Sequence, residues 1–194
     1  MRDIFKIDNI NNYNNDFYER VLKIIKKEKQ EKIKKLVNQD DKKRSILGEY
    51  LLIESLKELK IDYDKINIKY NKNNKPYIEN NNIFYNISHK GIYSCIIVST
   101  KEVGIDIEEI IEFNKVILKY ISSENEIRFI NNNIDYYKLY TLKEAYFKML
   151  GEDLFNLKSI EFILNNREII TKENIKIKTK IINNYFISII KSAN

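Results

Sequence analysis

The sequence predicts an α+β protein made of two similar α/β halves that pack tightly against each other. The chain has 194 residues, of which 43% are apolar, which is enough for one ordinary domain or two small ones with a core. Two stretches with the apolar spacing of helices are each followed by stretches with the pattern of strands. Helix and strand patterns in this order favour helices packed on a sheet in each half.

In the first half, residues 16–25 have the spacing of an amphipathic helix, and a lysine-rich segment around Ile33 follows. A longer helix is expected through residues 45–59, with Asp40 or Asp41 as its N-cap. Asparagine-rich turns separate the strands that come next. These strands are expected at residues 66–70, 83–87 and 93–99.

The second half begins with the apolar strand of residues 103–107. Helices are expected at residues 124–131 and 136–150, and Gly151 is the expected C-cap of the second. Strands are expected at residues 159–164, 174–180 and 184–190.

The boundary between the halves is expected near residues 99–102, because a second run of elements starts there without a flexible linker. This gives an N-terminal half of residues 1–100 and a C-terminal half of residues 101–194.

The net charge of +6 reflects a composition rich in Asn, Lys, Ile and Tyr, as an AT-rich genome produces. We therefore expect an anionic ligand or an acidic protein partner and no nucleic acid. The chain has no apolar run of about 18 residues and no secretory signal pattern, so a cytoplasmic protein without a membrane partner is expected. The one cysteine, Cys95, lies in an apolar run and is expected to fill core space.

Two acids share one face of the strand over residues 103–107 and its extension. Asp106 and Glu108 are two positions apart, so their side chains point the same way, roughly 6.8 Å apart along the backbone. Their repulsion is about 2.4 kcal/mol at an effective dielectric constant near 20, but only about 0.6 kcal/mol in bulk water. Either this face is solvated, or a cation lies between the carboxylates.

A third acid comes from the helix of residues 136–150. Glu144 and Lys148 are four positions apart on one helix face, and an isolated pair of this kind is worth only about 0.3 to 0.5 kcal/mol. With Asp106 and Glu108, however, Glu144 supplies the hard oxygen ligands that Mg²⁺ accepts. Lys148 would then lie where a phosphate oxygen needs a positive charge.

The only histidine, His89, follows Ser88 at the end of a strand and precedes Gly91. A single histidine of this kind is often structural or simply exposed. Its place after a strand, with a glycine that allows close backbone approach, also fits a loop that contacts phosphate. Both interpretations remain open at this point.

Three sequence blocks together carry a resemblance to a known family. NISHKG, then GIDIE, then LKEAYFKMLG stand in the order and approximate spacing of the signature blocks of the 4′-phosphopantetheinyl transferases, of the surfactin-synthetase-activating (Sfp-type) class. The resemblance covers about residues 29 to 155. It implies a monomeric pseudodimer with the active site in the cleft between the halves.

By this resemblance, the protein transfers the phosphopantetheine arm of coenzyme A to a serine of an apo acyl or peptidyl carrier protein and releases 3′,5′-ADP. Asp106, Glu108 and Glu144 would bind Mg²⁺, with Mn²⁺ as a possible substitute. Glu144, Lys148 and His89 would be catalytic, with Glu144, directly or through water, drawing the proton from the serine. The family's coenzyme A contacts fall on Lys29, Lys32, Arg44, Ser45, Lys75, Pro76, Ser88, His89 and Lys148.

The chain departs from the family pattern at three positions and matches it at one more. Asn74 stands where the family has Gly before Lys-Pro, Tyr140 replaces a Trp, and Asp153 replaces a Gly in the closing loop. Glu126 matches the acid of the family's helix that opens with Ser or Thr. The first and third departures concern loop geometry, and the second concerns packing.

Two other functions fit part of the pattern. A Mg²⁺-dependent nuclease or phosphodiesterase would use the same three acids and Lys148, but it leaves NISHKG unexplained. A catalytically silent protein that binds carrier proteins would not need an intact set of acids. The sequence does not distinguish fatty-acid, polyketide and peptide carriers, nor does it show tolerance of acyl-coenzyme A.

Overall fold

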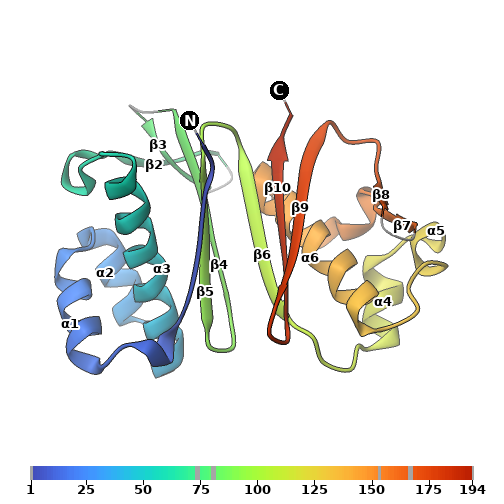
Figure 1. Cartoon of the computed structure of the whole chain (residues 1–194), viewed down its shortest axis with the longest axis horizontal. Coiled ribbons are helices and arrows are strands. Elements are labelled where there is room, and N and C mark those ends of the chain that lie inside the picture. The colour runs from blue at the N-terminus through green and yellow to red at the C-terminus, as the bar shows by residue number, and fades with distance from the viewer. Residues whose placement is uncertain (1, 73–74, 80–81, 153, 166–167, 194) are drawn as a thin grey trace.

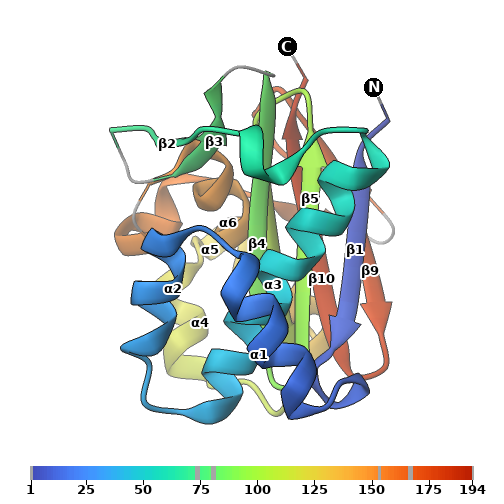
Figure 2. The ribbon, with the colours of Figure 1, turned by 90° about the vertical axis from the view of Figure 1, so that its left-hand side faces the viewer.

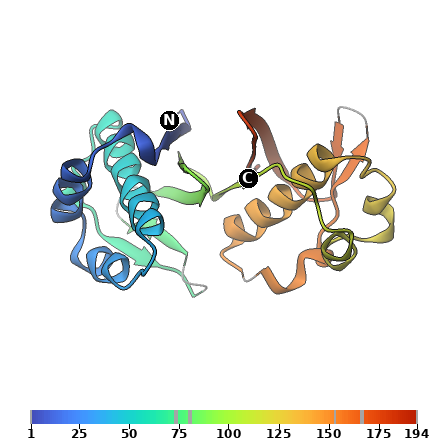
Figure 3. The same ribbon diagram turned by 90° about the horizontal axis from the view of Figure 1, so that it is seen from below.

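The computed structural model describes residues 2–72, 75–79, 82–152, 154–165 and 168–193. The chain forms four layers, with two β-sheets face to face in the middle and helices on the outer side of each sheet (Figure 1). The view from below shows the same separation into two groups of helices (Figure 3). The predicted α+β fold with two halves is confirmed. We use N-terminal half for the elements up to β5 and C-terminal half for those from β6 onward.

The N-terminal half has one five-stranded antiparallel sheet in the order β1-β5-β4-β3-β2, with its helices on one face (Figure 2). Its strands are β1 (Ile4–Asn9), β2 (Ile68–Tyr70), β3 (Pro76–Ile78), β4 (Ile83–Lys90) and β5 (Tyr93–Ser99). Its helices are α1 (Asn15–Ile24), α2 (Lys27–Lys34) and α3 (Gln39–Glu58).

The C-terminal half has a three-stranded antiparallel sheet in the order β6-β10-β9 and a separate β7-β8 hairpin. Its strands are β6 (Val103–Glu109), β7 (Ile163–Asn165), β8 (Glu168–Ile170), β9 (Ile175–Ile182) and β10 (Tyr185–Ser192). Its helices are α4 (Lys115–Ile121), α5 (Glu124–Ile127) and α6 (Asn133–Leu150).

Strand β5 shows why both faces of a central sheet need apolar residues. Ile96 and Val98 pack against the helices, whereas Cys95 and Ile97 face the second sheet, because successive side chains of a strand point to opposite faces. Cys95 is completely buried, as expected for a core-filling thiol. Burial strongly raises its pKa, so this cysteine remains a neutral thiol.

The two halves share a core between their sheets. Val103, Ile105 and Ile107 of β6 pack there with Cys95 and Ile97 of β5. Polar contacts also cross, and two of them are these: Asn86 Oδ1 accepts a hydrogen bond of 2.8 Å from the Ile105 backbone, and Lys191 pairs with Asp3 at 2.5 Å. The sheets are therefore held together by a continuous apolar layer and by contacts at its edges.

Helix α3 begins at Gln39, six residues before the expected start at residue 45, and its cap differs from the expected one. Asn38 is the N-cap, and its side chain accepts hydrogen bonds from the backbone of Asp40 and Asp41. Those two acids lie in the first turn, where negative charge stabilises the positive end of the helix. The prediction of Asp40 or Asp41 as the cap was wrong.

Strand β1 precedes the first helix and was not predicted, whereas β6 was predicted as the first element of the C-terminal half. Both halves therefore begin with a strand. Helices α2 and α4 are further additions. The strand expected at residues 159–164 begins only at Ile163, because residues 154–159 form 3₁₀ turns.

Within the described part of the chain, no helix is both long enough and apolar enough to cross a membrane. The departures at Asn74 and Asp153 fall on residues outside the described ones.

Candidate active site

Strand β6 brings its acids against α6 because its even-numbered residues face that helix. Gly104 makes the approach possible, since a Cβ atom there would lie 1.9 Å from the Ala145 carbonyl oxygen and 2.5 Å from the Met149 nitrogen. The α6 backbone therefore contacts the strand directly. This contact places Asp106 beside Glu144 and Lys148 of the helix.

Three carboxylates form the acidic cluster, defined as Asp106, Glu108 and Glu144. One oxygen from each lies within 4.8 Å of the others. Asp106 is 1% exposed and Glu144 is 6% exposed, so solvent screens little of their repulsion. Such a cluster requires positive charge nearby.

Lys148 supplies part of that charge. Its Nζ atom lies 2.5 Å from Asp106 Oδ1 and 3.6 Å from the Glu144 carboxylate. Burial by itself would lower the pKa of Lys148, but attraction by Asp106 and Glu144 outweighs it and raises the pKa. The side chain thus remains an ammonium group at neutral pH.

The second oxygen of Asp106 identifies the position that a cation would fill. Asp106 Oδ2 is buried and has no hydrogen-bond partner among the described residues. A buried anionic oxygen without a partner is costly, and three carboxylate oxygens at this spacing are the donors that Mg²⁺ or Mn²⁺ binds. The residues present therefore fit a divalent cation.

The pKa values of the two glutamates show the same excess of negative charge. Burial, followed by the charge of Asp106, raises the pKa of Glu144 to about 7. Burial also raises the pKa of Glu108, which Lys90 only partly offsets. Without a cation, the acidic cluster holds a proton more tightly than isolated carboxylates do.

Strand β4 of the N-terminal half contributes Ser88, which is buried between the halves. Its hydroxyl donates to Asp106 Oδ1 at 3.0 Å and accepts from Lys148 Nζ at 3.1 Å. Lys90, which the sequence analysis did not select, pairs with Glu108 at 2.7 Å. The only signal for Lys90 was its place inside NISHKG.

His89 lies between these two residues at the exposed end of β4. Protein atoms crowd the ring enough that desolvation lowers the pKa of His89, and the charges of Arg44 and Lys148 lower it further. The imidazole is therefore neutral at pH 7. A bound anion beside it would favour the protonated form.

Arg44 and Ser45 lie near the start of α3, where Arg44 faces the β4-β5 hairpin. The Arg44 guanidinium donates to the Gly91 carbonyl and pairs with Asp41, and the Ser94 hydroxyl donates to the Arg44 carbonyl at 2.8 Å. Ser45 is partly buried. This part of α3 is thus tied to the hairpin that carries His89.

The two lysines predicted on the nucleotide side lie in α2. Lys29 pairs at 3.2 Å with Glu49, a buried residue of α3. Lys32 pairs with Glu28 at 2.7 Å and lies 4.8 Å from the centre of the Tyr70 ring. Both amines have partners inside the N-terminal half.

Lys75 and Pro76 stand at the start of β3, and the Lys75 amine points into the protein. Its Nζ atom donates to the backbone carbonyls of Val103, at 3.0 Å, and Met149. Only 8% of Lys75 is exposed. The structure thus places this side chain against the elements that carry the acidic cluster.

Tyr140 lies one turn before Glu144 on α6. Its ring stacks on Tyr136, with centroids 6.0 Å apart, and Tyr136 stacks on Phe113 at 5.0 Å. Burial and then the charge of Glu144 raise the pKa of Tyr140 strongly, so its hydroxyl remains protonated. An aromatic wall beside Glu144 is consistent with the packing role expected for this position.

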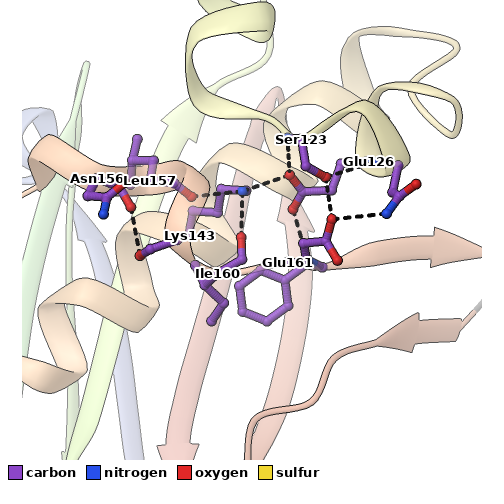
Figure 4. Close-up of polar contacts among 10 residues, drawn as sticks. Ser123, Glu126, Lys143, Asn156, Leu157, Ile160 and Glu161 are labelled. Carbon is purple, nitrogen blue, oxygen red and sulfur yellow. Dashed lines mark hydrogen bonds and ion pairs between the residues drawn. The ribbon is translucent and has the colours of Figure 1, made fainter.

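A buried ion pair supports α6 from behind the acidic cluster (Figure 4). Lys143, next to Glu144 in the chain, is fully buried and pairs with Glu126 at 2.8 Å. It also donates to the carbonyls of Leu157 and Ile160, both at 2.8 Å, while Glu126 accepts from the Phe162 backbone at 2.8 Å. These bonds hold the segment of residues 157–162 against α6, and no sequence signal identified Lys143.

The fold and site define a protein of two α+β halves, in which α6, β6 and β4 together bring charged groups into one cluster that suits a divalent cation. Two family models match consecutive parts of the chain: 4′-phosphopantetheinyl transferase, N-terminal, over residues 12–101, and 4′-phosphopantetheinyl transferase superfamily over residues 102–190. The chain therefore belongs to the 4′-phosphopantetheinyl transferase superfamily. This confirms the resemblance found in the sequence.

Two curated relatives are similar to it. The 4′-phosphopantetheinyl transferase gsp of Aneurinibacillus migulanus is 32% identical over 128 residues, which is 62% of this chain and 54% of the relative. The 4′-phosphopantetheinyl transferase HetI of Nostoc sp. is 27% identical over 134 residues, which is 64% of this chain and 55% of the relative. The chain spans about half the length of the curated relatives it matches.

Proposed function

We propose that this protein transfers the 4′-phosphopantetheine group of coenzyme A to a serine of an apo acyl or peptidyl carrier protein. The observation that carries the proposal is the meeting of Asp106, Glu108, Glu144 and Lys148 with Ser88 across the two halves, in a chain of this superfamily. Both curated relatives are named as 4′-phosphopantetheinyl transferases.

Asp106, Glu108 and Glu144 would hold the metal ion, Mg²⁺ or Mn²⁺. When bound, the ion supplies positive charge to the diphosphate of coenzyme A. Asp106 Oδ2, for which the described residues offer no partner, and the raised pKa of Glu144 support this assignment.

In the proposed reaction, the carrier serine oxygen forms a bond to the β-phosphorus of coenzyme A. The phosphoanhydride bond breaks, and its electron pair leaves with 3′,5′-ADP. Glu144 accepts the serine proton, directly or through water, and its place beside Asp106 and Lys148 supports this role. Lys148 stabilises the negative charge that develops on the phosphate oxygens, and His89 adds to this when an anion is bound.

For coenzyme A, we propose contacts at Lys29, Lys32, Arg44, Ser45, Pro76, Ser88, His89 and Lys148. Arg44, Lys29 and Lys32 are paired with carboxylates here, so an incoming phosphate would compete with Asp41, Glu49 and Glu28. Lys32 and Glu28 are both well exposed, and such a pair is worth at most about 1 kcal/mol, so Lys32 exchanges its partner readily. Glu49 is buried, so taking Lys29 from it would cost more, and the bound phosphate must offset that cost. Each of these contacts is a proposal from the family pattern.

We propose that one chain is sufficient for activity, because the site draws on both halves of the same molecule. The carrier protein would approach with an acidic surface, which the net charge of +6 favours. Association should then weaken as salt concentration rises.

The test is to incubate the protein with coenzyme A, Mg²⁺ and an apo carrier protein and to weigh the carrier by mass spectrometry. We expect a mass gain equal to one phosphopantetheine group, and no gain when Mg²⁺ is removed with a chelator. A folded protein that binds the carrier but leaves its mass unchanged with several carriers would indicate the silent binding protein. Cleavage of plasmid DNA that Asp106→Asn abolishes would indicate the nuclease.

A further inference from the structure

We infer that Lys75 is a positioning residue: its amine ties the N-terminal half to both elements that carry the acidic cluster, and thereby holds α6 and β6 in register. This differs from the nucleotide contact that the family pattern suggests for Lys75. The inference uses the proposed transfer reaction for its kinetic test only, and the geometry is independent of that reaction.

The two acceptors of the Lys75 amine lie next to the residues of the site. Val103, whose carbonyl accepts at 3.0 Å, is the first residue of β6 and precedes Asp106 by three positions. Met149, whose carbonyl also accepts, directly follows Lys148 on α6. One side chain therefore connects the beginning of β6 with the end of α6.

The end of α6 is a favourable place for an ammonium group. The last carbonyl groups of a helix receive no hydrogen bond from within the helix. A positive charge beside them is also stabilised by the helix dipole. Gly151 follows with a φ angle of 72°, and a Cβ atom at that position would lie 2.8 Å from Lys75 Cβ. The glycine cap thus packs directly on the lysine stem.

The backbone of Lys75 is fixed on its own side as well. The Asn71 side chain accepts from the Lys75 backbone at 2.9 Å, and the Asn71 backbone donates to the Lys75 carbonyl at 3.0 Å. The amine is consequently held from a closed turn of the N-terminal half. Lys75 is thus fixed both at its backbone and at its amine, so it can hold α6 and β6 at a set distance from the N-terminal half.

Burial explains why the amine is committed to this position. Desolvation lowers the pKa of Lys75 to about 8, and Glu102 offsets only part of the effect. If the amine turned outward to a phosphate of coenzyme A, the Val103 and Met149 carbonyls would lose a buried donor. The Lys75 side chain therefore makes its hydrogen bonds inside the protein. It affects the reaction by fixing the positions of Lys148 and Asp106.

The experiment compares Lys75→Met with Lys72→Met. Methionine keeps most of the apolar stem and removes the donors, while Lys72 is an exposed residue of the same turn and serves as the matched control. For Lys75→Met we expect kcat to fall by about tenfold or more, as for other residues that orient site ligands, and KM for coenzyme A to change little. Lys72→Met should resemble the wild type.

Binding of Mn²⁺, followed by electron paramagnetic resonance without coenzyme A or carrier protein, gives a second readout. We expect weaker Mn²⁺ binding in Lys75→Met and unchanged binding in Lys72→Met. A rise in KM for coenzyme A that exceeds the fall in kcat would overturn the inference, as would unchanged kcat and Mn²⁺ affinity. Failure of the wild type to modify any carrier would overturn the proposed function but leave the Mn²⁺ test of Lys75 intact.

If Lys75→Met does not fold, the positioning role is tested by nuclear magnetic resonance of the ¹⁵N-labelled lysine amines in the wild type. A buried, hydrogen-bonded amine exchanges its protons slowly, and its resonance should persist unchanged when coenzyme A is added. The resonance is assigned with Lys75→Arg, which keeps the charge and the donors. A rapidly exchanging Lys75 amine, or one that shifts strongly with coenzyme A, would refute the positioning role.

Discussion

Asp106 has two carboxylate oxygens with different surroundings. Oδ1 accepts from Lys148 and Ser88, whereas Oδ2 is buried without a partner among the described residues. The first oxygen is thus satisfied by the protein, and the second is available to a cation. This difference makes Asp106 the residue at which the metal assignment can be tested most directly.

Asp106→Asn should abolish detectable Mn²⁺ binding and lower carrier modification by about a hundredfold or more, because an amide is a poor ligand and removes one negative charge. Calorimetry and the carrier mass assay measure the two effects. Glu112→Gln, at an exposed position beyond β6, is the control and should change neither. Normal Mn²⁺ affinity in Asp106→Asn would exclude this residue as a ligand.

Glu144 should make the metal-free protein less stable as pH rises. Its folded pKa of about 7 lies above the unfolded value of 4.5, so the folded state binds the proton more tightly. The resulting stability is fully present below pH 4.5 and is lost as pH rises towards and through 7. The loss is on the order of 3 kcal/mol.

Glu144→Gln therefore should raise the melting temperature of the metal-free protein at pH 8 and have little effect at pH 5. Thermal unfolding with a chelator present measures this difference, and addition of Mg²⁺ should stabilise the wild type but not the variant. An equal effect of the substitution at both pH values would contradict the raised pKa.

Lys148 and Arg44 should affect different kinetic parameters. Lys148→Ala removes charge next to the reacting phosphate and should lower mainly kcat, whereas Arg44→Ala should raise mainly KM for coenzyme A. Steady-state kinetics with coenzyme A as the varied substrate separates the two. Parallel changes of both parameters in both variants would count against the assigned roles.

The contact between α6 and β6 determines the site at the scale of elements. Helix α6 presents Glu144 and Lys148 on one face, and strand β6 presents Asp106 and Glu108, but only the absence of a side chain at Gly104 lets them meet. Lys75 and the buried Lys143–Glu126 pair then fix the helix from two other directions. The site thus depends on backbone contact between two elements.

Gly104→Ala should lower the free energy of unfolding by about 1 to 3 kcal/mol and weaken Mn²⁺ binding, because the methyl group would overlap the α6 backbone. Urea unfolding and Mn²⁺ titration measure both effects. Gly48→Ala is the matched control: its methyl group would meet side-chain atoms of Ile87, Cγ2 at 2.8 Å and Cδ1 at 3.7 Å, instead of the backbone of another element, and alanine favours a helix. Equal stability of the two variants would argue against the close contact.

The elements that the sequence predicted correctly are those with strong periodicity. Strand β5 contains a continuous apolar run, and β6 has apolar residues at alternate positions, as buried strands do. Helix α6 has a long apolar stripe at helical spacing, and Gly151 is its observed C-cap. Helices α2 and α4 were not predicted. The first has one buried apolar residue, and the second is short and exposes Val116 and Tyr120. Helix α4 is capped by the Asn114 side chain, whereas α2 has no side-chain cap and depends on packing through Ile33.

The whole molecule is held together by the apolar layer between the two sheets. Because both halves contribute to this layer, and because the polar contacts of Ser88 and Asn86 also cross it, neither half is expected to unfold alone. The site lies at the same boundary, so folding of the two halves and assembly of the site are one event.

Ile105→Ala should lower the stability by about 2 to 5 kcal/mol, because Ile105 is fully buried between the sheets. Unfolding in urea should remain a single transition. Circular dichroism and the hydrogen-exchange protection of backbone amides in each half measure it. Ile170→Ala, at an exposed position of β8, should have little effect. Separate transitions for the two halves would contradict a shared core.

The sequence by itself determined the chemistry of the site and the alternation of the strands, because residue types and their spacing are local properties. It thereby gave the acids at 106, 108 and 144, the lysine at 148 and the family. Only the tertiary structure decided which groups meet: Ser88 with Asp106, Lys90 with Glu108, Lys75 with the end of α6, and Lys143 with Glu126. These contacts join residues that are far apart in the chain, and their partners depend on how two sheets and a helix pack, which no local pattern encodes.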